Sequence, residues 1–373
     1  MALTISNRKG IFGLFINRSR TPYLPVPQPP TQKDIARELG ISAMTVSLAL
    51  RKHPKISAAT RQRVVEASER MGYRINPYVR AFVIQHRRGM ASHQRLPLAL
   101  LNLWKPPSLW KKECWSRQLH EGCVKRAGEL GYSIDEIALQ SPGMTARRAN
   151  QILKSRGIRG VLVAPTPSSH GHLRIDWQHF AASAIGFTLR RPNLHRTSGN
   201  PTQAMQLTLH HLKHAGYRRV GLRIGKHPVR RMDGGWTSAL LEYQQWLPEK
   251  ERIPIHYHES LEKDRKEFLA WVKRHRPDVV IGLGLIAYSW LTGAGYSIPG
   301  DIGFVHLGWD EELHESPGVE FTGTSIGNRQ IGARAVDLVV SQLEHNEYGI
   351  PDEPTITMVT PRWIPGNTIR RKG

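Results

Sequence analysis

Side chains at the start of a helical pattern over residues 42–50 could touch the edges of DNA bases. Val46 and Leu50 are four residues apart and face inward, which leaves the opposite side of the pattern exposed. The outward residues are Ala43, Met44, Ser47 and Leu48. Ala, Met and Leu can contact thymine methyl groups but cannot form the bidentate hydrogen bonds that read guanine. Two interpretations stay open: a weak or degenerate DNA binder, or one that discriminates through thymine methyls and DNA deformation.

Three short helices must position this face. Thr31 can cap the first helix, and Gly40 supplies the left-handed residue that ends it. Ser42 follows two residues later and caps the second helix, which is the spacing of a helix-turn-helix. Ser57 can cap a third helix. Residues 31–76 are therefore predicted to form a three-helix DNA-binding head.

Positive charge is concentrated near the N-terminus. The chain has 373 residues and a formal net charge of +23, and residues 1–95 hold 17 Lys and Arg against 4 Asp and Glu. This concentration indicates a polyanionic partner. Residues 1–30 end in a proline-rich run and are expected to form a disordered tail. Cys114 and Cys123 form no C-x-x-C motif, which argues against a zinc finger and fits a reducing cytoplasm.

From Leu96 onward, apolar strand patterns alternate with helical patterns, which predicts parallel sheets twice over. The first half has strand patterns over 96–104, 134–139, 160–165 and 183–189, and after a crossover near residue 197 the second half has them over 218–225, 278–283 and 301–310. The uncharged stretch 279–298 is long enough for a bilayer, but its glycines and the following proline favour a buried strand and then a helix. We therefore expect no membrane partner.

Ligands of open α/β folds bind outside the carboxyl ends of the strands. The residues that this rule selects are Trp104, Trp110, Arg190, Arg191 and Asp310. A carboxylate there can accept two sugar hydroxyls, and a tryptophan face can stack on a sugar ring. Simple packing is the alternative for Trp104 and Trp236.

No motif in the chain asks for catalysis or a cofactor. It has no G-x-S-x-G, no P-loop and no H-E-x-x-H, so we expect no enzyme. His210 and His214 lie four apart on a predicted helix and could hold a metal. A third ligand is not near them in sequence, so a solvated helix face is the favoured interpretation and no metal is expected.

The head and the residues after it closely resemble the lactose-repressor (LacI/GalR) family of bacterial transcription regulators. The similar motifs are KDIARELGIS, MTVSLAL, the S-x-x-T-R run that starts at Ser57, and GYRINP from Gly72. In the second half, IPGDIGFVHLGWDEE, QIGARAVDLVVSQLEHNEYGIP and a closing W-x-x-G-x-T are also similar. The resemblance implies an all-α helix-turn-helix head plus an α/β two-lobed periplasmic-binding-protein-like core with parallel sheets.

The resemblance also implies a function. We expect a cytoplasmic homodimer that binds double-stranded operator DNA sequence-specifically, as a repressor, with an affinity modulated by a small-molecule effector such as a sugar. The expected domains are the tail over 1–30, the head over 31–76, a hinge helix and linker over 77–95, and an effector-binding and dimerisation core over 96–373. Two rivals stay open: a constitutive DNA-binding regulator with a decayed effector pocket, and a solute-binding receptor.

Individual contacts carry over from the resemblance. The residues expected to touch the DNA backbone are Thr31, Ser42, Thr45, Ser47, Lys55, Ser57, Thr60, Tyr73 and Asn76. Phe82 aligns with the leucine by which paired hinge helices wedge into a base step. Asp310 matches the family's effector-contacting aspartate. The family's effector arginine is not cleanly present, because alignment on GWTSAL puts Met232 in its place and Arg231 one residue away, before Trp236.

Overall fold

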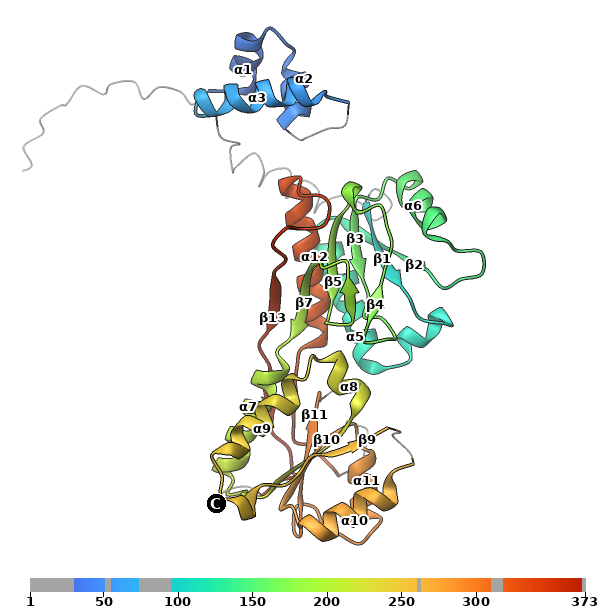
Figure 1. The fold of residues 1–373 in the computed structure, drawn as a ribbon, viewed down its shortest axis with the longest axis vertical. Coiled ribbons are helices and arrows are strands. Elements are labelled where there is room, and N and C mark those ends of the chain that lie inside the picture. The colour runs from blue at the N-terminus through green and yellow to red at the C-terminus, as the bar shows by residue number, and fades with distance from the viewer. Residues whose placement is uncertain (1–29, 51–54, 74–94, 260–262, 310–317, 371–373) are drawn as a thin grey trace, which may run out of the picture. The chain divides into compact units, whose positions relative to one another are not determined.

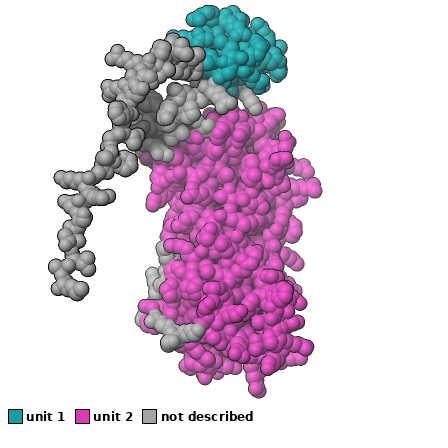
Figure 2. Space-filling view, turned by 90° about the vertical axis from the view of Figure 1, so that its left-hand side faces the viewer, with its two compact units in different colours: residues 1–76 teal, residues 77–373 magenta. Residues whose placement is uncertain are grey.

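The computed structural model describes residues 30–50, 55–73, 95–259, 263–309 and 318–370. Contacts divide the chain into two compact units, Met1–Asn76 and Pro77–Gly373, which Figure 2 shows in different colours. The expected hinge helix, with Phe82, lies outside the described residues, and so do Asn76 and Asp310.

The first unit is a bundle of three helices, α1 (Gln32–Leu39), α2 (Ala43–Leu50) and α3 (Ala58–Arg70). Thr31 forms a capping box with Asp34, and Gly40 ends α1 in a left-handed conformation with a φ of 66°. The buried core consists of Ile35, Ala36, Val46, Ala49, Val64 and Ala67. The predicted helix-turn-helix is therefore confirmed, and α3 packs against it to complete the small core.

The second unit has two lobes, each with a six-stranded sheet (Figure 1). In the N-terminal lobe the strand order is β13-β7-β5-β3-β1-β2, and all neighbours are parallel. The strands are β1 (Leu96–Asn102), β2 (Tyr132–Ala138), β3 (Gly160–Val163), β5 (Ala181–Ile185), β7 (His195–Gly199) and β13 (Ile356–Val359). The helices are α5 (Cys114–Glu129), α6 (Ala146–Ser155) and α12 (Asn328–His345). The long α12 packs against α5, β5 and β7.

Two strands of this lobe differ from the sequence-based expectation. The strand expected over 183–189 is β5, which ends at Ile185 because Gly186 takes a φ of 73°. The crossover expected near residue 197 comes directly after Gly199, but the strand before it, β7, was not predicted. The sequence of β7 is polar, so it does not show the apolar pattern that predicts a buried strand. Its polar groups find partners inside the lobe, since the Thr197 hydroxyl donates to the Ile331 carbonyl at 3.2 Å.

In the C-terminal lobe the strand order is β14-β12-β11-β10-β8-β9, with only the β12–β14 pair antiparallel among the described pairings. The strands are β8 (Val220–Gly225), β9 (His256–His258), β10 (Val279–Leu283), β11 (Gly303–Leu307), β12 (Gly323–Ser325) and β14 (Arg362–Ile364). The helices are α7 (Pro201–His214), α8 (Lys226–Arg231), α9 (Gly235–Gln245), α10 (Arg265–His275) and α11 (Ile286–Thr292). The predicted strand and helix within 279–298 are thus β10 and α11.

The two lobes share their connections. The chain passes between them from β7 to α7, from β12 to α12, and from β13 to β14. One continuous apolar cluster includes buried residues of both sheets, among them Leu100 in β1 and Leu222 in β8. The two-lobed α/β prediction is therefore confirmed. No helix among the described residues is long and apolar enough to cross a membrane.

Candidate DNA-reading face and inter-lobe site

The N-terminal turn of α2 presents the residues expected to read DNA. Val46 is fully buried in the head, as its helical spacing predicts. Met44 is 68% exposed, and Ala43 and Leu48 are partly exposed on the same helix. A methionine this exposed buries little of its side chain in the head, so this face is available to contact a partner.

The predicted backbone-contacting hydroxyls lie at helix starts. The Ser42 Oγ accepts a hydrogen bond from the Thr45 amide at 3.0 Å, and the Ser57 Oγ accepts one from the Thr60 amide at 3.2 Å. These hydroxyls are therefore helix caps. Ser42 and Ser57 are also exposed, so the same oxygens and the free amides of the first turn can reach a phosphate.

The remaining described candidates of the head lie near its edges. The Tyr73 hydroxyl accepts a hydrogen bond from Gln32 Nε2 at 3.0 Å, which ties the segment after α3 to the first turn of α1. Lys55 is exposed just before α3, and Ser47 is partly exposed on α2. Hydrogen bonds from Thr31 hold the pKa of the Asp34 carboxyl, in the capping box of α1, below its usual range, so Asp34 stays ionised at neutral pH.

Arg231 joins the two lobes. It is the last residue of α8, and its Nη1 donates to the carbonyl oxygens of Thr166 and Pro167 in the loop after β3. Its guanidinium carbon lies 5.9 Å from the ring centroid of Trp104 and 5.4 Å from that of Trp115. We call Trp104, Trp115, Thr166, Pro167, Arg190 and Arg231 the inter-lobe site.

A left-handed turn separates Arg231 from the next helix. Asp233 and Gly234 have φ values of 52° and 74°, so the helix ends and α9 begins at Gly235. Gly235 packs so closely on Pro201 that an added Cβ would lie 2.6 Å from its ring. Met232, which the resemblance puts in the place of the effector arginine, packs instead against the apolar cluster.

The electrostatics of Arg231 are unusual for an arginine. Burial lowers its pKa to about 10, which still leaves the group charged at neutral pH. Within the described residues no salt bridge joins it to a carboxylate. The carbonyls and the two indole faces stabilise the cation only partly, because cation–π contacts contribute about 0.5–2 kcal/mol each.

Other polar contacts cross between the lobes nearby. Arg190 Nη2 lies 2.8 Å from Asp233 Oδ1, with both side chains well exposed. His227 Nε2 lies 3.1 Å from the Pro167 carbonyl oxygen. Trp104 is oriented by its indole N–H, which donates to the Pro165 carbonyl at 2.8 Å. The expected ligand face therefore contains Trp104, Arg190 and Arg231 together.

The other expected effector residues lie elsewhere. Trp110 is fully buried and Trp236 is 3% exposed, both inside the apolar cluster, which favours packing as the role of these two residues. Arg191 is exposed in the short strand β6 (Leu189–Arg191). Asp310 lies outside the described residues, so its expected contact stays a prediction.

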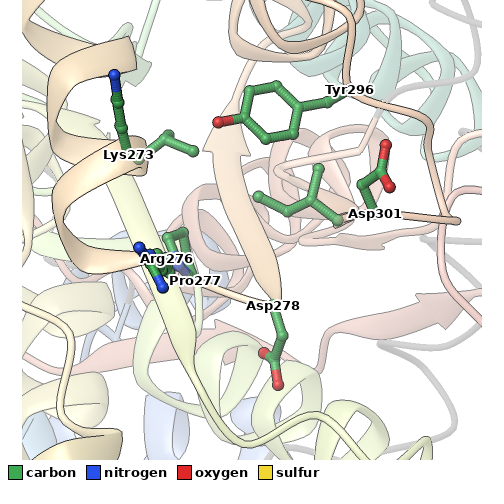
Figure 3. A pocket seen from close by; sticks show the side chains of 8 residues that line it. Lys273, Arg276, Pro277, Asp278, Tyr296 and Asp301 are labelled. Carbon is green, nitrogen blue, oxygen red and sulfur yellow. The ribbon is translucent and has the colours of Figure 1, made fainter.

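A separate cavity of about 350 Å³ lies in the C-terminal lobe (Figure 3). Its wall includes Lys273, Arg276 and Asp278, which precede β10, and Tyr296 and Asp301, which precede β11. The cavity therefore lies at the amino ends of these strands. The Asp278 carboxylate already accepts hydrogen bonds from the amides of the two residues that follow Tyr217. Because α/β ligands bind at the carboxyl ends of strands, this cavity is not where we expect the effector.

The histidines of α7 form no metal cluster. The rings of His210 and His214 lie 4.2 Å apart, and His214 Nδ1 is 2.8 Å from the His210 carbonyl oxygen. Among the described residues no group of three or more His, Cys, Asp or Glu could hold a metal ion.

Two family models match the chain. The model described as bacterial regulatory proteins of the lacI family matches residues 31–76, and the periplasmic binding protein-like domain matches residues 209–369. The chain is 26% identical over 309 residues to the HTH-type transcriptional regulator MalR of Streptomyces coelicolor, covering 78% of this chain and 81% of the relative. It is 23% identical over 369 residues to an uncharacterized HTH-type regulator in the aml 5' region of Streptomyces limosus, covering 91% of this chain and 97% of the relative.

The chain therefore carries a LacI-family DNA-binding domain and a periplasmic-binding-protein-like domain, and its relatives are HTH-type transcription regulators. Its fold agrees with two solved family structures. One is the regulator CelR in complex with cellobiose, with a TM-score of 0.54, 18% identity, and coverage of 91% of this chain and 99% of that chain. The other is the Lac repressor dimer bound to operator and the anti-inducer ONPF, with a TM-score of 0.53, 18% identity and the same coverage. LacI-family proteins are DNA-binding transcription regulators and not enzymes.

Several residues of the inter-lobe site were not expected from the sequence. Trp115, Thr166 and Pro167 follow no sequence motif, because Trp115 looks like part of an amphipathic helix and the other two contribute backbone carbonyls. Asp233 was also missed as the partner of Arg190. A useful signal was present for Trp115 only: it lies shortly after the first strand, as Trp110 does.

Proposed function

We propose that this protein is a homodimeric repressor that binds a pseudo-palindromic operator and changes its operator affinity when a small molecule binds the inter-lobe site. The observation that carries the proposal is the exposed N-terminal face of α2 in a compact three-helix unit. The proposed domains are those expected from the sequence, with the tail over 1–30, the head over 31–76, the hinge and linker over 77–95 and the core over 96–373. Such a regulator would act in the cytoplasm, where the chromosome lies.

The proposed DNA contacts follow from exposure on the head. Met44, Ala43 and Leu48 would contact base edges in the major groove, chiefly thymine methyls. The capping hydroxyls would bind phosphates and so orient α2 in the groove. Phe82 would wedge between base pairs, as the resemblance implies.

The effector would bind where the lobes meet. It would contact Trp104, Arg190 and Arg231, and Asp310 is proposed as a further contact from the family resemblance. A ligand that contacts both lobes stabilises one arrangement of the lobes over another. This difference in free energy can change how the two heads bind DNA. The sugar-bound relatives named above support a hydroxylated ligand class.

A constitutive regulator is the second candidate. The lobes already contact each other directly, through Arg231 with Thr166 and through Arg190 with Asp233. If these contacts hold the lobes in their DNA-binding arrangement, no ligand is needed. This candidate predicts operator binding that no small molecule alters.

Selection from a random duplex library tests operator recognition. We expect enrichment of an inverted repeat, because a homodimer presents two heads related by two-fold symmetry. Met44→Ala should weaken binding to the selected site by about fivefold, since it removes apolar contact area worth on the order of 1 kcal/mol.

The matched control is Met144→Ala in the other unit, which should leave operator affinity unchanged. Enrichment of no repeat, or equal effects of the two alanine variants, would contradict the proposed reading face.

A further inference from the structure

Arg231 offers an unused edge of its guanidinium group. A guanidinium carries five N–H donors, and Nη1 is the nitrogen that contacts Thr166 and Pro167. Nε and Nη2 donate to no acceptor among the described residues. Arg231 is partly exposed, and neither atom is among the fully enclosed side-chain atoms that lack a hydrogen-bond partner.

The unused edge has the geometry that binds an anion. Nε and Nη2 point the same way and form the fork that holds a carboxylate or phosphate with two parallel hydrogen bonds. Arg223 of the same chain uses these two atoms in this way, with Nε 3.2 Å from Asp264 Oδ2 and Nη2 2.5 Å from Asp264 Oδ1. Among the described residues, no carboxylate occupies the equivalent fork of Arg231.

The protein supplies no such anion to Arg231 within its described residues. Asp233, two positions away, is paired with Arg190 at 2.8 Å. Lys226 of the same helix is paired with Glu259 at 2.6 Å. A largely buried cation without a counter-charge is costly, and a bound anion would offset that cost.

We propose that the effector carries a carboxylate or phosphate group that binds the Nε–Nη2 edge of Arg231, with its ring against the indole of Trp104 or Trp115. This inference rests on the proposed effector function and specifies the ligand as an acidic molecule, such as a sugar acid or a sugar phosphate. Because the guanidinium lies near both indoles, a ligand with its anionic group on the fork can pack the apolar face of a sugar ring on one of them.

Tryptophan fluorescence of the full chain can test the anion site. All 10 tryptophans lie between Trp104 and Trp363, so the signal reports the core and not the basic head. Inorganic phosphate and acetate are titrated at constant ionic strength, maintained with chloride. We expect at least one of them to give a saturable change with the parent protein, and Arg231→Gln to weaken that binding by tenfold or more.

Two further variants make the result specific. Arg231→Lys keeps a point charge but loses the fork, so its affinity should fall between those of the parent and Arg231→Gln. Arg156→Gln is the matched control, because Arg156 is an exposed arginine paired with Asp135 at 3.3 Å in the N-terminal lobe. Arg231 has no carboxylate partner among the described residues, so Arg231→Gln should not unfold the core, and the melting temperature of each variant checks this. Equal responses of the parent and Arg231→Gln to both anions, whether both bind or neither does, overturn the inference.

Ring-bearing probes then separate the two anion types. Glucose, glucuronate and glucose 6-phosphate share one ring and differ in charge, so tighter binding of one acid identifies carboxylate or phosphate as the preferred group. A neutral sugar that releases operator from the parent and from Arg231→Gln equally would keep the proposed effector function and overturn the acidic effector. Failure of the parent to bind any selected operator would contradict the proposed function and leave the anion result standing.

Discussion

At the scale of single residues, Asp264 is the clearest test of what holds the C-terminal lobe together. The Arg223 side chain is fully buried and Asp264 is 13% exposed, with 2.5 Å between Nη2 and Oδ1. Asp264 Oδ2 also lies 2.9 Å from His256 Nε2. Burial raises the pKa of this carboxyl, but the hydrogen bonds from Arg223 and His256 outweigh burial and bring its pKa below the usual value of 3.8.

We expect Asp264→Asn to lower the free energy of unfolding by about 3–5 kcal/mol, because it leaves the Arg223 cation buried without its anion. The folded pKa of Asp264 is depressed, so its contribution is present above the unfolded pKa and is lost as pH falls through the folded value. The parent should therefore lose stability below about pH 4, and the variant should lack this part of the pH dependence.

Urea denaturation at several pH values measures both effects. Asp233→Asn is the matched control, since it breaks an exposed pair with Arg190 and should cost less than about 1 kcal/mol. A similar cost for the two variants would contradict a structural role for the buried pair.

At the scale of elements, the contact between α5 and α12 depends on two glycines. A Cβ added at Gly332 would lie 2.0 Å from the Leu119 carbonyl oxygen, and one added at Gly122 would lie 1.9 Å from the Arg329 carbonyl oxygen. The two helix backbones therefore touch directly, and the buried Cys123 thiol donates to the Gly332 carbonyl at 3.3 Å. Burial raises the pKa of this thiol to about 12, so it stays protonated and unreactive.

Gly332→Ala should destabilise the core by about 1–3 kcal/mol or more, because α5 and α12 must move apart. At a helix position with free space, the same substitution raises the free energy of unfolding by about 0.5–1 kcal/mol. The sign of the measured change therefore shows whether the added Cβ clashes. Gly128→Ala on α5 provides that comparison, since its Cβ would meet only the end of the Arg95 side chain at 3.1 Å. Thermal denaturation of both variants measures the difference, and two stabilised variants would show that the helices are not in backbone contact.

At the scale of the whole molecule, charge is divided unevenly between the N-terminal part and the core. Residues 1–95 hold 17 of the 53 Lys and Arg but only 4 of the 30 Asp and Glu. In the core, many basic side chains are paired, as Arg126 is with Asp337 at 2.6 Å. The net attraction for a polyanion therefore comes mainly from the N-terminal part.

Operator affinity should fall on the order of a hundredfold or more as salt rises from about 50 to about 200 mM, because each phosphate contact releases counterions. A filter-binding titration over that range measures the slope. Effector affinity, measured by tryptophan fluorescence, should change much less, because a single partly buried contact is screened weakly. A flat operator slope would contradict the phosphate contacts proposed for the head.

The sequence by itself determined the head and the class of the core. The caps at Thr31, Ser42 and Ser57 and the helix end at Gly40 are interactions between residues a few positions apart, so their spacing is visible along the chain. The alternation of strands and helices likewise implies parallel sheets, because parallel neighbours need a crossover between them.

Tertiary structure alone decided which side chains meet in the inter-lobe site and to which sheet β7 and β13 belong. Alignment put Met232 where an arginine was expected, but in the folded chain it is Arg231, at the end of α8, that contacts Trp115 and the Thr166 carbonyl of the other lobe. The polar strand β7 and the C-terminal strand β13 pair in the first sheet although no apolar pattern marks β7. These contacts join residues far apart in sequence, so they are set by packing of the whole core and leave no local pattern for a sequence to show.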